Sequence, residues 1–189
     1  MKLVLASNSP RRKELLSGLG VDFEVKVAKG VDEGYPRTLD AADVAEYIAV
    51  EKASAYAVAD DEVVLTADTV VVVDNNILGK PKDEADALRM LHAISGKTHK
   101  VVTGVCIKNC STQRSFSVST DVTFKKLANH EIEHYVKTFK PYDKAGAYGI
   151  QEWIGYIGVT SISGSYYNVM GLPVQRVYQE LVAHFGLEI

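Results

Sequence analysis

The stretch from Val63 to Asp74 constrains the fold more than any other part of the sequence, because it is the most β-branched segment of the chain. A run this rich in valine is typical of a strand buried in the core. Asp68 lies in the middle of the run. Because an unpaired carboxylate is very costly to bury, Asp68 must meet a cation, a hydrogen-bond network or a metal. A structural ion pair and a functional site account equally well for this one residue.

The other elements mix helices and strands without strict alternation, which predicts an α/β fold whose mixed twisted β-sheet is flanked by helices. The 189 residues suit a single domain over 1–189, pinched into two lobes around a cleft. We expect a hairpin turn at Asn75-Asn76, and helix caps at Ser9 and Asn129. We expect further strands at 2–6, 21–28, 77–79, 99–108, 114–127 and 154–162, and helices at 10–19, 40–59, 83–94, 129–139 and 173–185.

Composition and charge narrow the class of protein. Hydrophobic residues make up 47% of the chain, which is ordinary for a globular protein, and the net charge of −3 argues against a dedicated nucleic-acid binder. The two cysteines, Cys106 and Cys110, match neither a disulfide framework nor a zinc site, which favours a reducing compartment. No apolar run approaches the roughly 18 residues of a membrane span. We therefore expect a soluble cytoplasmic protein without nucleic-acid or membrane partners.

The segment from Ser7 to Arg12 is the first candidate site. It joins a predicted strand to a helix that Ser9 caps and Pro10 begins. A helix N-terminus binds anions through its unpaired N–H groups, and the arginine fork suits phosphate oxygens. In the alternative interpretation of this segment, Ser9 only caps the helix and the arginine side chains are solvated. Two cations at a helix N-terminus oppose the helix dipole, however, so we favour the anion site.

Other charged residues complete a possible phosphate site. Glu33 and its neighbour Asp32 lie in a loop, Lys52 lies on a predicted helix, and Lys80 lies between a glycine and a proline that fix its backbone. Each is unremarkable alone. Together with the arginines and Asp68 they form the set of groups that a magnesium-bound triphosphate requires.

Two further segments contain polar side chains that could act on a ligand. The small-residue loop from Asp143 to Gln151 allows a flat ligand to approach the backbone, and the Gln151 amide could read a pyrimidine edge. The segment from His130 to His134 matches the H-E-x-x-H motif of zinc proteases. That motif starts at the end of a predicted helix rather than in its middle, so we regard a zinc protease as a remote alternative.

Several ordered motifs at matching spacing cover essentially the whole chain. They are Ser7-Asn8-Ser9-Pro10-Arg11-Arg12 with Leu15-Leu16, Val31-Asp32-Glu33, Glu51-Lys52-Ala53, Ala67-Asp68-Thr69, Gly79-Lys80-Pro81, Asp143-Lys144-Ala145-Gly146, Gly164-Ser165-Tyr166 and Gly171-Leu172-Pro173. In these motifs the sequence resembles the Maf family.

The resemblance implies a fold similar to that of inosine triphosphate pyrophosphatases, and hydrolysis of nucleoside triphosphates to monophosphate and pyrophosphate with Mg²⁺ or Mn²⁺. The loop that ends at Gln151 resembles the branch that acts on dTTP and UTP. A homodimer is implied at the level of the family only. Carried over by position, Asp68 resembles the proton acceptor. Arg11, Thr69 and Gln151 resemble residues tied to substrate choice, and Ser7, Ser9, Arg12, Glu33, Lys52 and Lys80 match other polar positions of the pocket.

We therefore expect Glu33 and Asp68 to hold the metal with phosphate oxygens, while a water attacks the α-phosphorus. Whether Asp68 acts as the base or as a metal ligand stays open. The arginines, Lys52 and Lys80 would neutralise the triphosphate. The competing hypothesis is a non-catalytic nucleotide sensor linked to cell division, which would bind nucleotide without releasing pyrophosphate.

Overall fold

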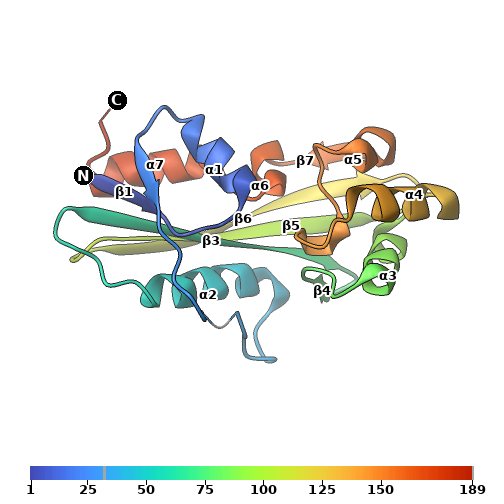
Figure 1. Cartoon of the computed structure of the whole chain (residues 1–189), viewed down its shortest axis with the longest axis horizontal. Coiled ribbons are helices and arrows are strands. Elements are labelled where there is room, and N and C mark those ends of the chain that lie inside the picture. The colour runs from blue at the N-terminus through green and yellow to red at the C-terminus, as the bar shows by residue number, and fades with distance from the viewer. Residues whose placement is uncertain (32, 189) are drawn as a thin grey trace. The chain divides into compact units, whose positions relative to one another are not determined.

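A computed structural model describes residues 1–31 and 33–188 of the chain. Seven strands form one mixed sheet in the order β2-β1-β3-β5-β6-β7, with β4 paired to β3 (Figure 1). This sheet and its helices confirm the predicted α/β class. The strands are β1 (Lys2–Leu5), β2 (Phe23–Val25), β3 (Glu62–Val73), β4 (Asn76–Leu78), β5 (Thr98–Lys108), β6 (Gln113–Phe124) and β7 (Val159–Ser163).

The helices account for most of the remaining regular structure. They are α1 (Pro10–Ser17), α2 (Ala41–Ser54), α3 (Glu84–Ile94), α4 (Asn129–Phe139), the 3₁₀ turn η1 (Ala145–Ala147), α5 (Trp153–Gly158), α6 (Tyr166–Met170) and α7 (Val174–Phe185). None of the helices within the described ranges is long and apolar enough to cross a membrane.

The chain divides into two compact units, and each is described separately. The first unit comprises the chain up to Asp68, Thr103–Val118 and the C-terminal part from Gly171. In this unit β1 lies parallel to both β2 and the first half of β3, with Val4 opposite Val64. The apolar side chains of β1 and of this half of β3 are buried because parallel strands of an α/β sheet are covered on both faces.

Helix α2 packs very closely on the sheet of the first unit. A Cβ atom added at Gly104 on β5 would lie about 2 Å from the backbone of Ala45 and Glu46, so only glycine allows this approach. The buried hydroxyl of Thr66 on β3 donates to the carbonyl of Ala49 at 2.6 Å. These contacts fix α2 against β3 and thereby place the following turn of α2, which carries Lys52.

The second unit comprises Thr69–Val102 and Ser119–Met170. Its hairpin between β3 and β4 turns at Asp74 and Asn75, whose φ angles are 49° and 62°. The predicted turn was therefore placed one residue too late. Two residues with positive φ suit the right-handed twist of a two-residue hairpin, and aspartate and asparagine tolerate that conformation better than other side chains.

Four predicted elements differ from the structure. The segment predicted as a strand at 154–162 begins as helix α5, and only its second half forms β7. Short apolar runs do not distinguish a buried helix from a strand, and Gly155 on α5 packs so closely on the Ile150 carbonyl that a Cβ would lie 1.9 Å from that oxygen. Strand β2 and helix α2 are both shorter than predicted. Helix α4 begins after Ala128, and the Glu131 carboxylate caps the Ala128 N–H at 2.8 Å, so Asn129 is not the cap.

Candidate functional site

The junction between β1 and α1 has the conformation that the sequence predicts. Ser9 is the N-cap of α1, and its hydroxyl accepts from the backbone N–H of Arg12 at 3.4 Å. The Ser7 hydroxyl accepts from the N–H of Ser9 at 3.2 Å. Pro10 occupies the first turn, where its missing N–H costs nothing. The two serine side chains therefore hold the loop in shape, and Arg11 follows on the half-buried first turn of the helix.

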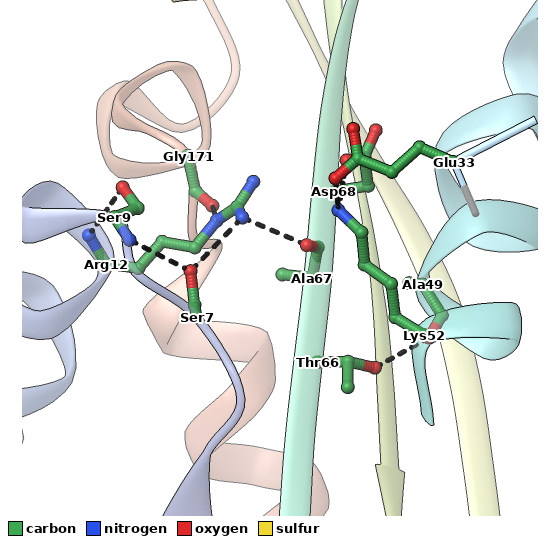
Figure 2. Close-up of polar contacts among 10 residues, drawn as sticks. All are labelled: Ser7, Ser9, Arg12, Glu33, Ala49, Lys52, Thr66, Ala67, Asp68 and Gly171. Carbon is green, nitrogen blue, oxygen red and sulfur yellow. Dashed lines mark hydrogen bonds and ion pairs between the residues drawn. The ribbon is translucent and has the colours of Figure 1, made fainter. Parts of the chain in front are cut away.

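Arg12 links this loop to two distant segments of the first unit. Its Nε donates to the Gly171 carbonyl at 2.8 Å, and its Nη1 donates to the Ala67 carbonyl at 2.9 Å. Nη1 also lies 3.5 Å from the Ser7 hydroxyl (Figure 2). Burial lowers the pKa of Arg12, while the nearby Asp68 carboxylate acts in the opposite direction. The guanidinium thus places a positive charge beside the residue that precedes Asp68.

Asp68 has a cationic partner, as its place in a buried strand requires. Its Oδ1 lies 2.8 Å from Nζ of Lys52, and both side chains are largely buried, with 14% and 15% of their surface exposed. The same Nζ lies 2.8 Å from Oε1 of Glu33, whose side chain is half-exposed. Figure 2 shows the two carboxylates converging on the Lys52 ammonium from different segments. Asp32, the neighbour of Glu33, lies outside the described residues.

The carboxylates of Glu33 and Asp68 supply the hard oxygen ligands that Mg²⁺ and Mn²⁺ prefer. Mg²⁺ is commonly held by one or two carboxylates plus substrate phosphates rather than by a full protein cage. Within residues 1–31 and 33–188 there is no group of three or more His, Cys, Asp or Glu side chains that could hold a metal. The two carboxylates on Lys52 therefore fit a metal that arrives with a phosphate ligand.

Three predicted site residues lie in the second unit. Thr69 is half-buried on β3, and Lys80 is exposed after β4. Gln151 follows the η1 loop, and its Oε1 is buried without a hydrogen-bond partner among the described residues. A buried acceptor without a donor is costly, so this amide is suited to a ligand that supplies an N–H group. The loop before it is anchored to the residue that follows β4, because the N–H of Gly146 donates to the Gly79 carbonyl at 3.0 Å.

The H-E-x-x-H segment lies on α4, and its first glutamate has another role. The Glu131 carboxylate accepts from the Ala128 N–H and pairs with Lys125 at 2.7 Å, which lowers the pKa of Glu131. The His134 ring packs edge-on against Trp153. A glutamate that caps its own helix is not positioned as a general base, so these contacts favour a structural role for the segment.

Sequence reasoning did not predict two pairings that organise the site. It included Lys52 among the site residues but did not predict that its ammonium pairs with both carboxylates. It also did not assign the Gly171 carbonyl as a partner of Arg12, because the two residues are separated by 159 positions. The Gly171-Leu172-Pro173 motif was the available signal. Lys52 lies on α2 three residues after Ala49, whose carbonyl accepts from the Thr66 hydroxyl. Its position beside Asp68 could be inferred only once the packing of α2 on β3 was known.

The fold and the site define an α/β protein that presents arginine and serine groups near a carboxylate–ammonium cluster, an arrangement suited to phosphorylated ligands. The chain belongs to the Maf-like protein family, whose model matches residues 2–184.

Two curated relatives are named dTTP/UTP pyrophosphatase. The protein from Phocaeicola vulgatus is 59% identical over 182 residues, which cover 95% of this chain and 94% of the relative. The protein from Parabacteroides distasonis is 56% identical over 186 residues, covering 97% and 96%. Among solved structures, the Staphylococcus aureus Ham1 protein is 16% identical with a TM-score of 0.53, covering 95% of this chain and 98% of that one. This likeness supports the fold expected from the sequence.

Proposed function

We propose that this chain hydrolyses dTTP and UTP to the nucleoside monophosphate and pyrophosphate. The observation that carries the proposal is the pairing of Asp68 with Lys52 at 2.8 Å, beside the serine- and arginine-containing loop of β1–α1. The names of relatives that are more than half identical over nearly their full length support the same reaction. The enzyme is thus a hydrolase acting on a phosphoric anhydride bond.

The residues of the first unit suit the triphosphate. The hydroxyls of Ser7 and Ser9 and the charges of Arg11 and Arg12 would bind phosphate oxygens at the N-terminus of α1. The two backbone carbonyls that Arg12 contacts hold its guanidinium in one orientation. Such preorganised charge stabilises the pyrophosphate as negative charge develops on it. Lys80 lies in the second unit, and its role in the site stays a prediction.

Asp68 is suited to accept the proton of the attacking water. The water oxygen forms a bond to the α-phosphorus, the bond from that phosphorus to the bridging oxygen breaks, and pyrophosphate leaves with the electron pair. The water proton passes to the Asp68 carboxylate. Lys52 holds this carboxylate in place through the 2.8 Å contact. A role of Asp68 as a metal ligand remains the alternative assignment.

Glu33, together with Asp68 if that residue is a metal ligand rather than the base, would hold the divalent cation, Mg²⁺ or Mn²⁺, that the reaction requires. When bound, such an ion neutralises phosphate charge and makes the phosphorus more electrophilic. Lys52 brings the two carboxylates together, because its ammonium lies 2.8 Å from each of them.

Gln151 and Thr69 would select the base. Uracil and thymine carry an N–H group flanked by two carbonyls, and the Gln151 amide has one acceptor and one donor to match them. The buried Oε1 of Gln151 gains a donor when such a base binds. A site that hydrogen-bonds a substrate N–H discriminates strongly against a base lacking it, as cytosine does at that position.

The proposal is tested by incubating the protein with a panel of triphosphates and Mg²⁺ and measuring pyrophosphate. We expect release from dTTP and UTP in preference to dCTP, dATP and dGTP, and none after chelation of the metal. Nucleotide binding without pyrophosphate release would instead support the sensor hypothesis. A requirement for stoichiometric zinc, with loss of function on substitution of His130 or His134, would support a zinc protease.

We further propose that the protein acts in the cytoplasm. Both Cys106 and Cys110 are free thiols, which suits the reducing cytoplasm. Assembly as a homodimer remains a prediction, which the sedimentation velocity of the purified protein would test.

A further inference from the structure

The turn that carries Gln151 is attached to helix α4 through one buried hydroxyl. Tyr135 on α4 is fully buried, and its hydroxyl donates to Oε2 of Glu152. The Tyr135 hydroxyl oxygen in turn accepts from the backbone N–H of Gly149 at 3.1 Å. Burial, followed by the contact with Glu152, raises the pKa of Tyr135, so the phenol keeps its proton and remains the donor. Tyr135 thus binds the residues on both sides of the Ile150-Gln151 pair.

The other oxygen of Glu152 extends this network to the start of the loop. Oε1 of Glu152 lies 3.1 Å from Nζ of Lys144, which also lies 2.8 Å from the Asp143 carboxylate. Only 10% of the Lys144 side chain is exposed. The loop from Asp143 to Glu152 is therefore closed by charge-assisted hydrogen bonds at its two ends, and such bonds are about twice as strong as neutral ones.

The packing around Gly149 leaves the turn little freedom. A Cβ atom added there would lie 3.0 Å from both Cδ of Glu152 and Cε of Lys144, closer than side chains normally approach. The N–H of Glu152 also donates to the Gly149 carbonyl at 3.0 Å, which closes the turn around Gln151. A largely shielded network of linked hydrogen bonds favours one conformation of the turn. The backbone that carries the Gln151 amide is fixed from both sides.

We propose that Tyr135 is a positioning residue for base selection, acting through Gly149 and Glu152 to orient Gln151. The inference rests on the proposed function, because it requires that Gln151 contacts the base. Tyr135 touches neither the phosphates nor the attacking water in this account. Its loss therefore changes which base is accepted more than it changes the chemical step.

The test is Tyr135→Phe, which removes only the hydroxyl. Without it the buried Gly149 N–H loses its acceptor, and the partly buried Glu152 carboxylate loses a donor. We expect kcat/KM for dTTP to fall about tenfold, mostly through KM, which corresponds to the loss of about one buried hydrogen bond. The ratio of kcat/KM for dTTP to that for dCTP should fall by a similar factor. The matched control is Tyr156→Phe, since Tyr156 is 80% exposed on α5 and should keep the parental ratio.

A second variant tests the same inference if Tyr135→Phe does not fold. Glu152→Gln keeps the shape and an acceptor for Tyr135 but removes the ion pair with Lys144, and we expect a smaller fall of the same ratio. A merely structural role would lower turnover of all nucleotides together and leave the ratio unchanged in both variants, which would overturn the inference. If the parental protein released no pyrophosphate from dTTP, the proposed function would fail first, and this inference with it.

Discussion

Nζ of Lys52 on α2 lies 2.8 Å from Oδ1 of Asp68 on β3, and the contact is largely shielded from water. The same Nζ lies at the same distance from Glu33, so a single ammonium balances two carboxylates. Removing one member of a shielded charge cluster leaves the others uncompensated, and the penalty is larger than for an exposed pair. The expected effects of substituting Lys52 or Asp68 depend on this balance of charges.

Lys52→Gln should lower kcat/KM for dTTP by at least about tenfold, because the variant loses a positive charge where the phosphates are bound and leaves two carboxylates facing each other. Initial rates of pyrophosphate release at saturating and limiting dTTP measure the effect. Lys137→Gln is the matched control, since Lys137 is an exposed residue on α4. Equal rates for Lys52→Gln and the parental enzyme would remove Lys52 from the site.

Arg12→Lys should destabilise the first unit by about 1–3 kcal/mol, because lysine cannot reproduce the two hydrogen bonds to the Gly171 and Ala67 carbonyls. Urea unfolding followed by circular dichroism measures the change. Arg37→Lys serves as the control, as Arg37 lies exposed in a loop of the same unit. If both variants unfold at the parental urea concentration, Arg12 does not link these segments in solution.

Thr66→Val should lower the free energy of unfolding by about 1–2 kcal/mol, since the isosteric change removes a fully buried donor to the Ala49 carbonyl. For a chain of this length that corresponds to a fall in Tm of roughly 2–8 °C. Thermal unfolding of the variant beside Thr138→Val, an exposed position on α4, makes the comparison. An unchanged Tm would show that the hydroxyl does not anchor α2 to β3.

Stability should fall as the pH is lowered from about 6.5 to 4, and His99 should cause part of the fall. Burial lowers the pKa of His99 from 6.5 to about 4, with Asp121 acting weakly in the opposite direction. Between these values the unfolded chain binds the proton and the folded one does not, so folding is progressively disfavoured. The full shift of the pKa corresponds to about 3 kcal/mol in the free energy of unfolding. The folded protein has lost all of this stability once the pH is below 4.

Urea unfolding at pH 7 and pH 5 of the parental protein and of His99→Gln measures this contribution. The variant should lose less stability between the two pH values, whatever its stability at pH 7. His92→Gln is the control because His92 is exposed on α3. An identical pH dependence in His99→Gln and the parental protein would contradict the assignment.

Local sequence patterns predicted the elements whose own residues decide their structure. The valine-rich strand β3, the capped helix α1 and the amphipathic helices α3 and α7 occur close to where the pattern placed them. Helix α5 was missed because tertiary packing decides its structure: Gly155 allows a backbone contact with Ile150 that no periodicity reveals. The cap of α4 was missed for a related reason, since a glutamate from inside the helix supplies it.

The candidate site was predictable in its residue types but not in its pairings. Charge and burial indicated that Asp68 needs a cation, but several lysines and arginines could have supplied it. The choice of Lys52 follows from the close packing of α2 on β5 at Gly104 and from the Thr66 hydrogen bond. The role of Arg12 depends on the Gly171 turn, which lies near the other end of the chain. Contacts between distant segments carry no local signal.

The most direct test of the central claim is pyrophosphate release from dTTP by the parental protein and by Asp68→Asn, with Mg²⁺ present and the folded fraction checked by circular dichroism. The parental protein should form equal amounts of dTMP and pyrophosphate. The variant, which keeps the shape of the side chain but loses its charge, should be folded and slower by at least about 10³-fold. A folded Asp68→Asn that hydrolyses dTTP at the parental rate would contradict the account.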